Sequence, residues 1–162
     1  GDLGSVVQRD ESSSLSEKLK EKVVYRWLHK HQSSGKIQGG KIKMTKTECA
    51  VYDLFKELGI PAHLSGYAYM SEAVKSAYEG EYGSVATERP GCMYRDVAEK
   101  FNTTASKVER CMRHSIEFAF LNANPQYLYK VFGNVVDKNK GRPTNVMFVY
   151  QCAKELDRRM SA

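Results

Sequence analysis

The hydrophobic spacing along residues 94–119 changes phase once, at residues 102–104. Before that point the apolar side chains recur at i, i+3, i+4 and i+7, the spacing of one face of a two-turn helix: Tyr94, Val97, Ala98 and Phe101. Asn102 follows. Of all residues except glycine, asparagine most readily adopts the left-handed conformation that ends a helix. Thr103 or Thr104 can cap a second helix. Its inward positions are Val108, Cys111, Met112, Ser115 and Ala119. The pattern predicts a short helix, a tight turn and a second helix over about 104–121.

The outward face of the second predicted helix is polar and cationic. Its side chains are Ser106, Lys107, Glu109, Arg110, Arg113, His114 and Glu117. Two helices joined in this way are typical of a helix-turn-helix, and Ala98 supplies a small residue where they would cross. The second helix of such a motif enters the major groove, where Arg or Lys can read guanine and Glu can accept from cytosine. The alternative is an ordinary solvated face in an all-α protein.

Capping and breaking residues predict the remaining helices. Thr45 and Glu48 form a capping box for a helix that ends at Gly59. Ser65 is expected to cap a helix over 66–78, followed by a loop over 79–91. The second helix of the motif is expected to end at 122–125. A short helix then ends at Gly133, a basic loop follows over 137–143, and a last helix capped by Thr144 runs to about Met160. The fold class is therefore all-α, a six-helix domain over 47–162 that contains the helix-turn-helix.

The segment before this domain has a different character. Residues 1–14 lack hydrophobic periodicity and read as a disordered tail or as residues left by cloning. Residues 15–31 are predicted to form a basic amphipathic helix, because apolar side chains recur every four residues at Leu15, Leu19, Val23 and Trp27. Residues 32–46 are expected to form either a flexible linker or a short hairpin that turns at Gly39 and Gly40.

Charge is segregated along the chain, whose formal net charge is +6. Residues 47–88 hold 2 Lys or Arg against 7 Asp or Glu, whereas residues 89–142 hold 10 against 5. The second basic segment coincides with the predicted helix-turn-helix, as contact with phosphates requires. Positive charge would also suit an acidic protein or a membrane surface, but neither explains the turn.

Several classes of protein are disfavoured. No apolar run is long enough for a membrane span and no signal peptide opens the sequence, so we expect a cytoplasmic protein without a membrane partner. The four cysteines are scattered without a Cys-x-x-Cys pair, which favours buried free thiols over a metal site or a disulfide scaffold. The absence of a nucleophile elbow, a phosphate-binding glycine loop and paired histidines argues against an enzyme and against a cofactor.

Four stretches of the sequence resemble a known family: "LGIPAHLSGYAYMSEAV", "VAEKFNTTASKVER", "RHSIE" and "GRPTNVMF". They are similar to the C-terminal DNA-binding effector domain of the stage zero sporulation response regulator, a bacterial transcription factor. The likeness runs from about residue 47 to the C-terminus. The stretch "CMRHSIEFAFLNANPQYLYKVF" departs from the family at many positions, so we read the chain as a divergent member.

The resemblance implies roles for individual side chains. Lys107, Glu109 and Arg110 occupy the positions that read bases in the family. Lys107 departs from the usual arginine and lacks its planar two-pronged fork, so its contact is expected to be less selective. The residues assigned to the DNA backbone or to secondary contacts are Thr104, Ser106, Arg113 and His114. From the basic loop, Lys138, Lys140 and Arg142 are expected to reach phosphates, with a solvated loop as the alternative.

The resemblance also implies partners. Family members bind double-stranded DNA, pair head-to-tail on tandem sites and contact an RNA polymerase sigma factor through the segment after the second helix of the motif. The same fold could instead be a protein-interaction module that binds a transcription component or regulator. The family's receiver domain has no counterpart among the 162 residues of this sequence.

Overall fold

The computed structural model describes residues 44–80 and 90–161 of the chain. The predicted tail over 1–14, the amphipathic helix over 15–31 and the linker or short hairpin over 32–46, except its last three residues, lie outside the described residues. Six helices form the described part: α2 (Lys46–Glu57), α3 (Ser65–Tyr78), α5 (Pro90–Lys100), α6 (Ala105–Asn122), α7 (Pro125–Phe132) and α8 (Asn145–Met160). These residues contain no strand, only an isolated bridge between Asp137 and Arg142. The predicted all-α, six-helix domain is confirmed.

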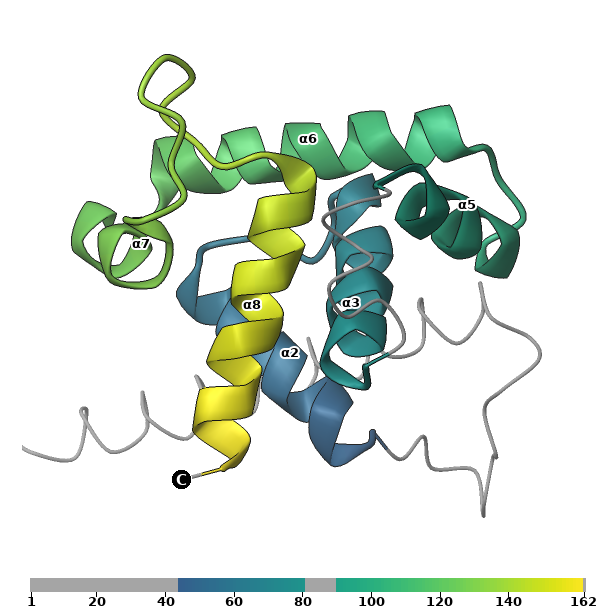
Figure 1. The fold of residues 1–162 in the computed structure, drawn as a ribbon, viewed down its shortest axis with the longest axis horizontal. Coiled ribbons are helices and arrows are strands. Elements are labelled where there is room, and N and C mark those ends of the chain that lie inside the picture. Colours follow the sequence, from purple (N-terminus) through teal and green to yellow (C-terminus); the bar gives the residue numbers. More distant parts are fainter. Residues whose placement is uncertain (1–43, 81–89, 162) are drawn as a thin grey trace, which may run out of the picture. The chain divides into compact units, whose positions relative to one another are not determined.

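Helix α3 lies at the centre of this unit, in contact with α2, α5, α6 and α8. Helix α6 lies across the N-terminal ends of α3 and α8, and α7 packs on α8 (Figure 1). An aromatic cluster fills the core between α2, α7 and α8. The ring of Phe132 stacks on Phe148 with centroids 4.9 Å apart, and Phe55 lies 6.4 Å from Phe148. All three are fully buried, and each contributes about 1.5–3 kcal/mol by leaving water.

The close crossing of α3 and α6 depends on a glycine. A Cβ atom at Gly66 would lie 2.2 Å from the carbonyl oxygen of Cys111 and 2.3 Å from Oγ of Ser115. The Ser115 hydroxyl is buried and donates to that same carbonyl oxygen at 2.9 Å. The two helices therefore touch backbone to backbone, which fixes where α6 lies on the domain.

The turn between α5 and α6 has the predicted geometry. Asn102 adopts a φ of 51°. The Thr103 amide donates to the Ala98 carbonyl at 2.9 Å and the Asn102 amide donates to Glu99 at 3.3 Å, the pair of hydrogen bonds of a Schellman motif. Ala98 is buried, as expected for a residue at the crossing of the two helices.

The capping predictions are confirmed at three helices and wrong at a fourth. Thr45, Thr104 and Thr144 each accept a hydrogen bond from a backbone amide three residues on, and Thr45 forms the full capping box. Ser65 does not cap α3. It is the first helical residue, and Leu64 takes the cap position without a side-chain hydrogen bond, because a turn from Pro61 already holds the chain there.

Two further expectations are corrected. Helix α5 begins at Pro90, inside the predicted loop and ahead of the apolar pattern, because proline has its φ preset for the first turn of a helix. The cysteines are free, but only Cys152 is buried, and Cys49, Cys92 and Cys111 are partly exposed. Helical spacing places Cys111 at the margin of the buried face, where solvent still reaches it.

Candidate nucleic-acid interface

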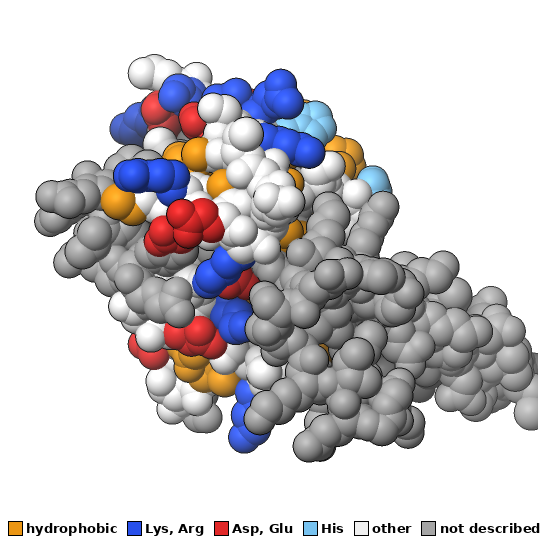
Figure 2. Space-filling model, turned by 90° about the vertical axis from the view of Figure 1, so that its right-hand side faces the viewer, with side chains coloured by type: hydrophobic (Ala, Val, Ile, Leu, Met, Phe, Trp, Pro, Cys, Tyr) orange, Lys and Arg blue, Asp and Glu red, His pale blue; other side chains and the backbone are white. Residues whose placement is uncertain are grey.

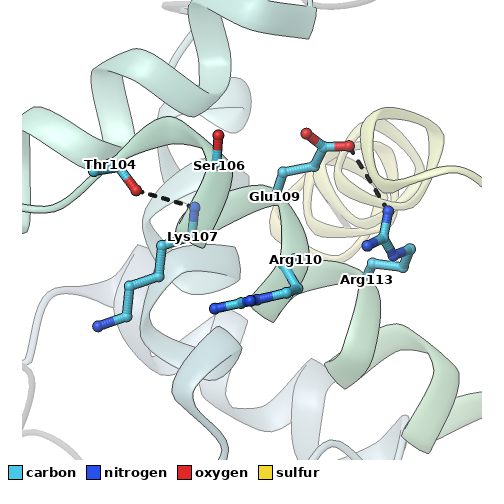
Figure 3. Close-up of a pocket in the computed structure, with 6 residues that line it drawn as sticks. All are labelled: Thr104, Ser106, Lys107, Glu109, Arg110 and Arg113. Carbon is cyan, nitrogen blue, oxygen red and sulfur yellow. Dashed lines mark hydrogen bonds and ion pairs between the residues drawn. The ribbon is translucent and has the colours of Figure 1, made fainter.

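The start of α6 carries a shallow depression lined by six side chains. They are Thr104, Ser106, Lys107, Glu109, Arg110 and Arg113 (Figure 3). Sequence reasoning selected all six as DNA contacts, and the structure brings them together at one place. His114 is also exposed on α6 but does not line the depression. We call these seven residues the recognition surface.

Local hydrogen bonding explains how the surface begins. The Thr104 hydroxyl accepts a hydrogen bond from the Lys107 amide at 3.2 Å, which satisfies one of the free amides at the helix start. The side chains of Lys107 and Arg110 point the same way from α6 (Figure 3). Within the described part of the chain, neither cationic group forms a hydrogen bond or an ion pair. Both cationic groups are therefore available to bind another molecule.

Glu109 and Arg113 lie on the other side of the depression and form a loose pair. Nη1 of Arg113 lies 3.9 Å from Oε1 of Glu109, and both side chains are half exposed. Such an exposed i, i+4 pair contributes only about 0.3–0.5 kcal/mol, because water screens it. Both groups can exchange this contact for a contact with another molecule at small cost.

The backbone at the start of α6 is held in place by two residues for which the sequence did not predict this role. Asn145, the first residue of α8, donates from Nδ2 to the backbone carbonyl of Glu109 at 3.1 Å. The Tyr94 side chain on α5 is hydrogen-bonded to Asn145, and burial raises the pKa of the Tyr94 hydroxyl, which stays protonated at neutral pH. Three helices therefore meet directly under the recognition surface. No local pattern could reveal this, since the residues are far apart in sequence.

An ion pair between the exposed Lys100 and the buried Glu72 fixes α5, the first helix of the motif, on α3. Nζ of Lys100 lies 2.7 Å from Oε1 of Glu72, whose side chain is almost fully buried. The hydroxyl of Ser76 lies 3.5 Å from both groups. A buried carboxylate needs such partners, and here they fasten the motif to the core.

The basic loop after α7 forms a compact turn beside α6. We call residues 137–142 the basic turn; in Figure 1 it projects past the C-terminal half of α6. Lys138 and Lys140 are exposed on it. Arg142 is partly buried, and its Nη2 lies 2.8 Å from Oε1 of Glu117 on α6. The structure thus places the predicted loop residues next to the helix of the recognition surface.

Viewed from the side of α5 and the start of α6, the surface is cationic at the top. Figure 2 shows Lys, Arg and His side chains gathered there, with acidic side chains among them and below. Over the residues that the structure describes, no group of three or more His, Cys, Asp or Glu side chains could hold a metal ion. The same part of the chain has no helix of the length and apolarity needed to cross a membrane.

One comparison with known proteins bears on this surface. The family model described as "Sporulation initiation factor Spo0A C terminal" matches residues 51–156, about two thirds of the chain. The matched span covers nearly all of the six-helix unit, including the recognition surface and the basic turn.

Proposed function

The chain belongs to the sporulation initiation factor Spo0A C-terminal family, and from this premise we propose that α6 reads base pairs in the major groove of double-stranded DNA. The members of this family are DNA-binding effector domains of sporulation regulators. The observation that carries the proposal is the pair of cations without partners in the described chain, Lys107 and Arg110, on the second helix of the motif. Arg110 can grip O6 and N7 of guanine with two parallel hydrogen bonds, and Glu109 can accept from N4 of cytosine. Lys107 adds a point charge that fits guanine less selectively.

The remaining residues of the proposed interface contact the sugar-phosphate backbone of the DNA. Thr104, Ser106, Arg113 and His114 flank the base-reading positions on the same exposed face of α6. Lys138, Lys140 and Arg142 extend the cationic surface onto the basic turn. Contacts to phosphate position a protein without carrying sequence information, so these residues supply affinity and register.

Selection from random duplex DNA tests this function directly. We expect an enriched sequence that the full chain binds more tightly than a scrambled duplex. We also expect binding that weakens steeply with salt, because each neutralised phosphate releases counterions. An Arg158→Ala variant is a suitable control, since it removes an exposed arginine at the far end of α8. Salt-independent binding, or no enriched sequence, would favour the alternative of a protein-interaction module.

The family likeness adds two partners to the proposal, a polymerase sigma factor and a second copy of the chain. Contact with a polymerase sigma factor would fall on the end of α6 and on α7, where Leu121 and Tyr129 are 84% and 76% exposed. Head-to-tail pairing of two copies on DNA would align the recognition surfaces over repeated sites. Crosslinking from Tyr129 to a purified sigma factor on a promoter duplex tests the first partner.

A further inference from the structure

The basic turn is ordered by its own hydrogen bonds. The Asp137 amide donates to the Arg142 carbonyl at 3.2 Å, and the Gly141 amide donates to the Asp137 carbonyl at 2.7 Å. The Asp137 side chain accepts from the Asn139 amide at 2.8 Å. Gly141 has a φ of +70°, a conformation that suits glycine. These bonds leave the side chains of Lys138 and Lys140 exposed.

Glu117 is the residue of α6 that forms an ion pair with this turn. It lies on the polar face of the helix, two turns beyond Arg110, which is about 10 Å along the helix axis. An acidic side chain at this place would repel a polyanion that binds the same face. Its carboxylate is instead 2.8 Å from the guanidinium of Arg142, the last residue of the turn.

We propose that the ion pair of Glu117 and Arg142 holds the basic turn against α6, so that Lys138 and Lys140 reach the phosphates that flank the bases read by α6. Glu117 is then a positioning residue for DNA binding. Arg142 then contributes through this pair as well as through its charge, and the two exposed lysines carry most of the phosphate contacts of the turn. The inference rests on the proposed function, because it assigns a role within the same interface.

Neutralising Glu117 separates this role from a simple effect of charge. If Glu117 acted only as a negative charge, Glu117→Gln would tighten DNA binding, because it removes repulsion and frees Arg142 for phosphate. If the pair positions the turn, the same change weakens binding, because the lysines lose their fixed placement. The two explanations predict opposite signs.

The first measurement needs no DNA. Amide hydrogen exchange of the full chain should be about threefold or more faster at Asp137 and Gly141 in Glu117→Gln, since opening of the turn exposes these amides. The charge-swapped variant Glu117→Arg/Arg142→Glu should restore the slow exchange of the unaltered chain. The control is Glu99→Gln, an exposed carboxylate on α5 away from the turn. Unchanged exchange in Glu117→Gln overturns the proposal whatever the DNA result.

The second measurement is a double-mutant cycle on a selected duplex at fixed salt. Lys140→Ala should lower the affinity and reduce the salt slope by up to about 0.9, the value for one phosphate contact. Glu117→Gln should weaken binding about threefold, and Lys140→Ala should cost less in that background than in the unaltered chain. Tighter binding by Glu117→Gln, or strictly additive effects, overturns the proposal. Failure of the unaltered chain to bind any duplex would instead refute the proposed function itself.

Discussion

Arg110 and Lys107 project from the same side of α6 but differ in what they can recognise. The guanidinium presents a rigid planar fork, whereas the ammonium is a flexible point charge. Both positions could be predicted from the sequence, because the 3.6-residue period alone places them opposite the buried Val108 and Met112. The supports behind them could not. Asn145 and Tyr94 meet α6 only through tertiary packing, and spacing within one helix carries no information about that.

Replacing Arg110 should separate binding from folding. We expect Arg110→Ala to lose about 5- to 150-fold in affinity for a selected duplex, because one two-pronged contact with guanine contributes about 1–3 kcal/mol of discrimination. The thermal unfolding midpoint should not change, since the side chain is exposed and has no partner in the described chain. Fluorescence anisotropy at fixed salt measures the affinity, with Arg158→Ala as the charge-matched control. Equal affinity of Arg110→Ala and the unaltered chain would remove Arg110 from the base-reading set.

At the scale of helices, cap chemistry predicted most boundaries and packing decided the rest. Thr104 and Thr144 are visible as caps because the interaction is local, within three residues. The start of α5 at Pro90 has no apolar periodicity to reveal it. The crossing of α3 and α6 is equally hidden, because Gly66 reads as a neutral helix residue until Cys111 is placed beside it.

The crossing gives a prediction with a distinctive sign. In an exposed helix, Gly→Ala stabilises by about 1 kcal/mol, because alanine is the better helix former. At Gly66 the added methyl would clash with the Cys111 backbone, so we expect Gly66→Ala to destabilise the domain by about 1–3 kcal/mol or more. It should also weaken DNA binding, because α6 must shift. Urea unfolding measures the first effect, with the exposed Ser65→Ala as control. A Gly66→Ala variant that is more stable than the unaltered chain would show that α3 and α6 can move apart without loss of free energy of unfolding.

At the scale of the whole molecule, a polar cluster joins the ends of α2, α7 and α8. The Arg159 guanidinium hydrogen-bonds to Glu57, Glu155 and the Tyr127 hydroxyl, and Tyr127 also donates to Glu57. The hydrogen bond from Arg159 lowers the pKa of Glu57, and the hydrogen bond from Arg158 is the main cause of the lowered pKa of Glu155. Burial, with the hydrogen bond to Glu57, raises the pKa of Tyr127 to about 12. These residues are up to 102 positions apart, so no sequence pattern could have predicted the cluster.

We expect this cluster to make the stability of the fold sensitive to acid. Because the folded-state pKa of each carboxyl lies below its ordinary value of 4.5, its stabilisation is present above that pH and is lost as pH falls through the folded value. Arg159→Gln should therefore flatten the loss of stability between pH 5 and pH 3, by roughly 1 kcal/mol or less because the pair with Glu57 is partly exposed. Urea midpoints at both pH values measure it. An identical acid dependence in Arg159→Gln and the unaltered chain would contradict the assignment.

Assembly on DNA is the last expectation at this scale. A head-to-tail contact joins two different surfaces, so it does not close on itself and is limited in length by the number of DNA sites. The chain offers complementary charge for such a contact, since residues 47–88 are acidic and residues 89–142 are basic. Each such contact is expected to be weak in free solution, because exposed charges are screened by salt. The two-fold alternative would come from the predicted amphipathic helix over 15–31, if two copies paired through its apolar face.

Light scattering and repeat geometry distinguish these arrangements. We expect the free chain to be monomeric or weakly associated, and to bind two directly repeated sites more tightly than the same sites inverted, because the head-to-tail contact then adds to the DNA contacts. The measurement should be repeated without residues 1–44, a truncation that keeps Thr45, the capping residue of α2. A tight free dimer that prefers inverted repeats, and that becomes a monomer without residues 1–44, would defeat the head-to-tail arrangement and assign dimerisation to the N-terminal segment.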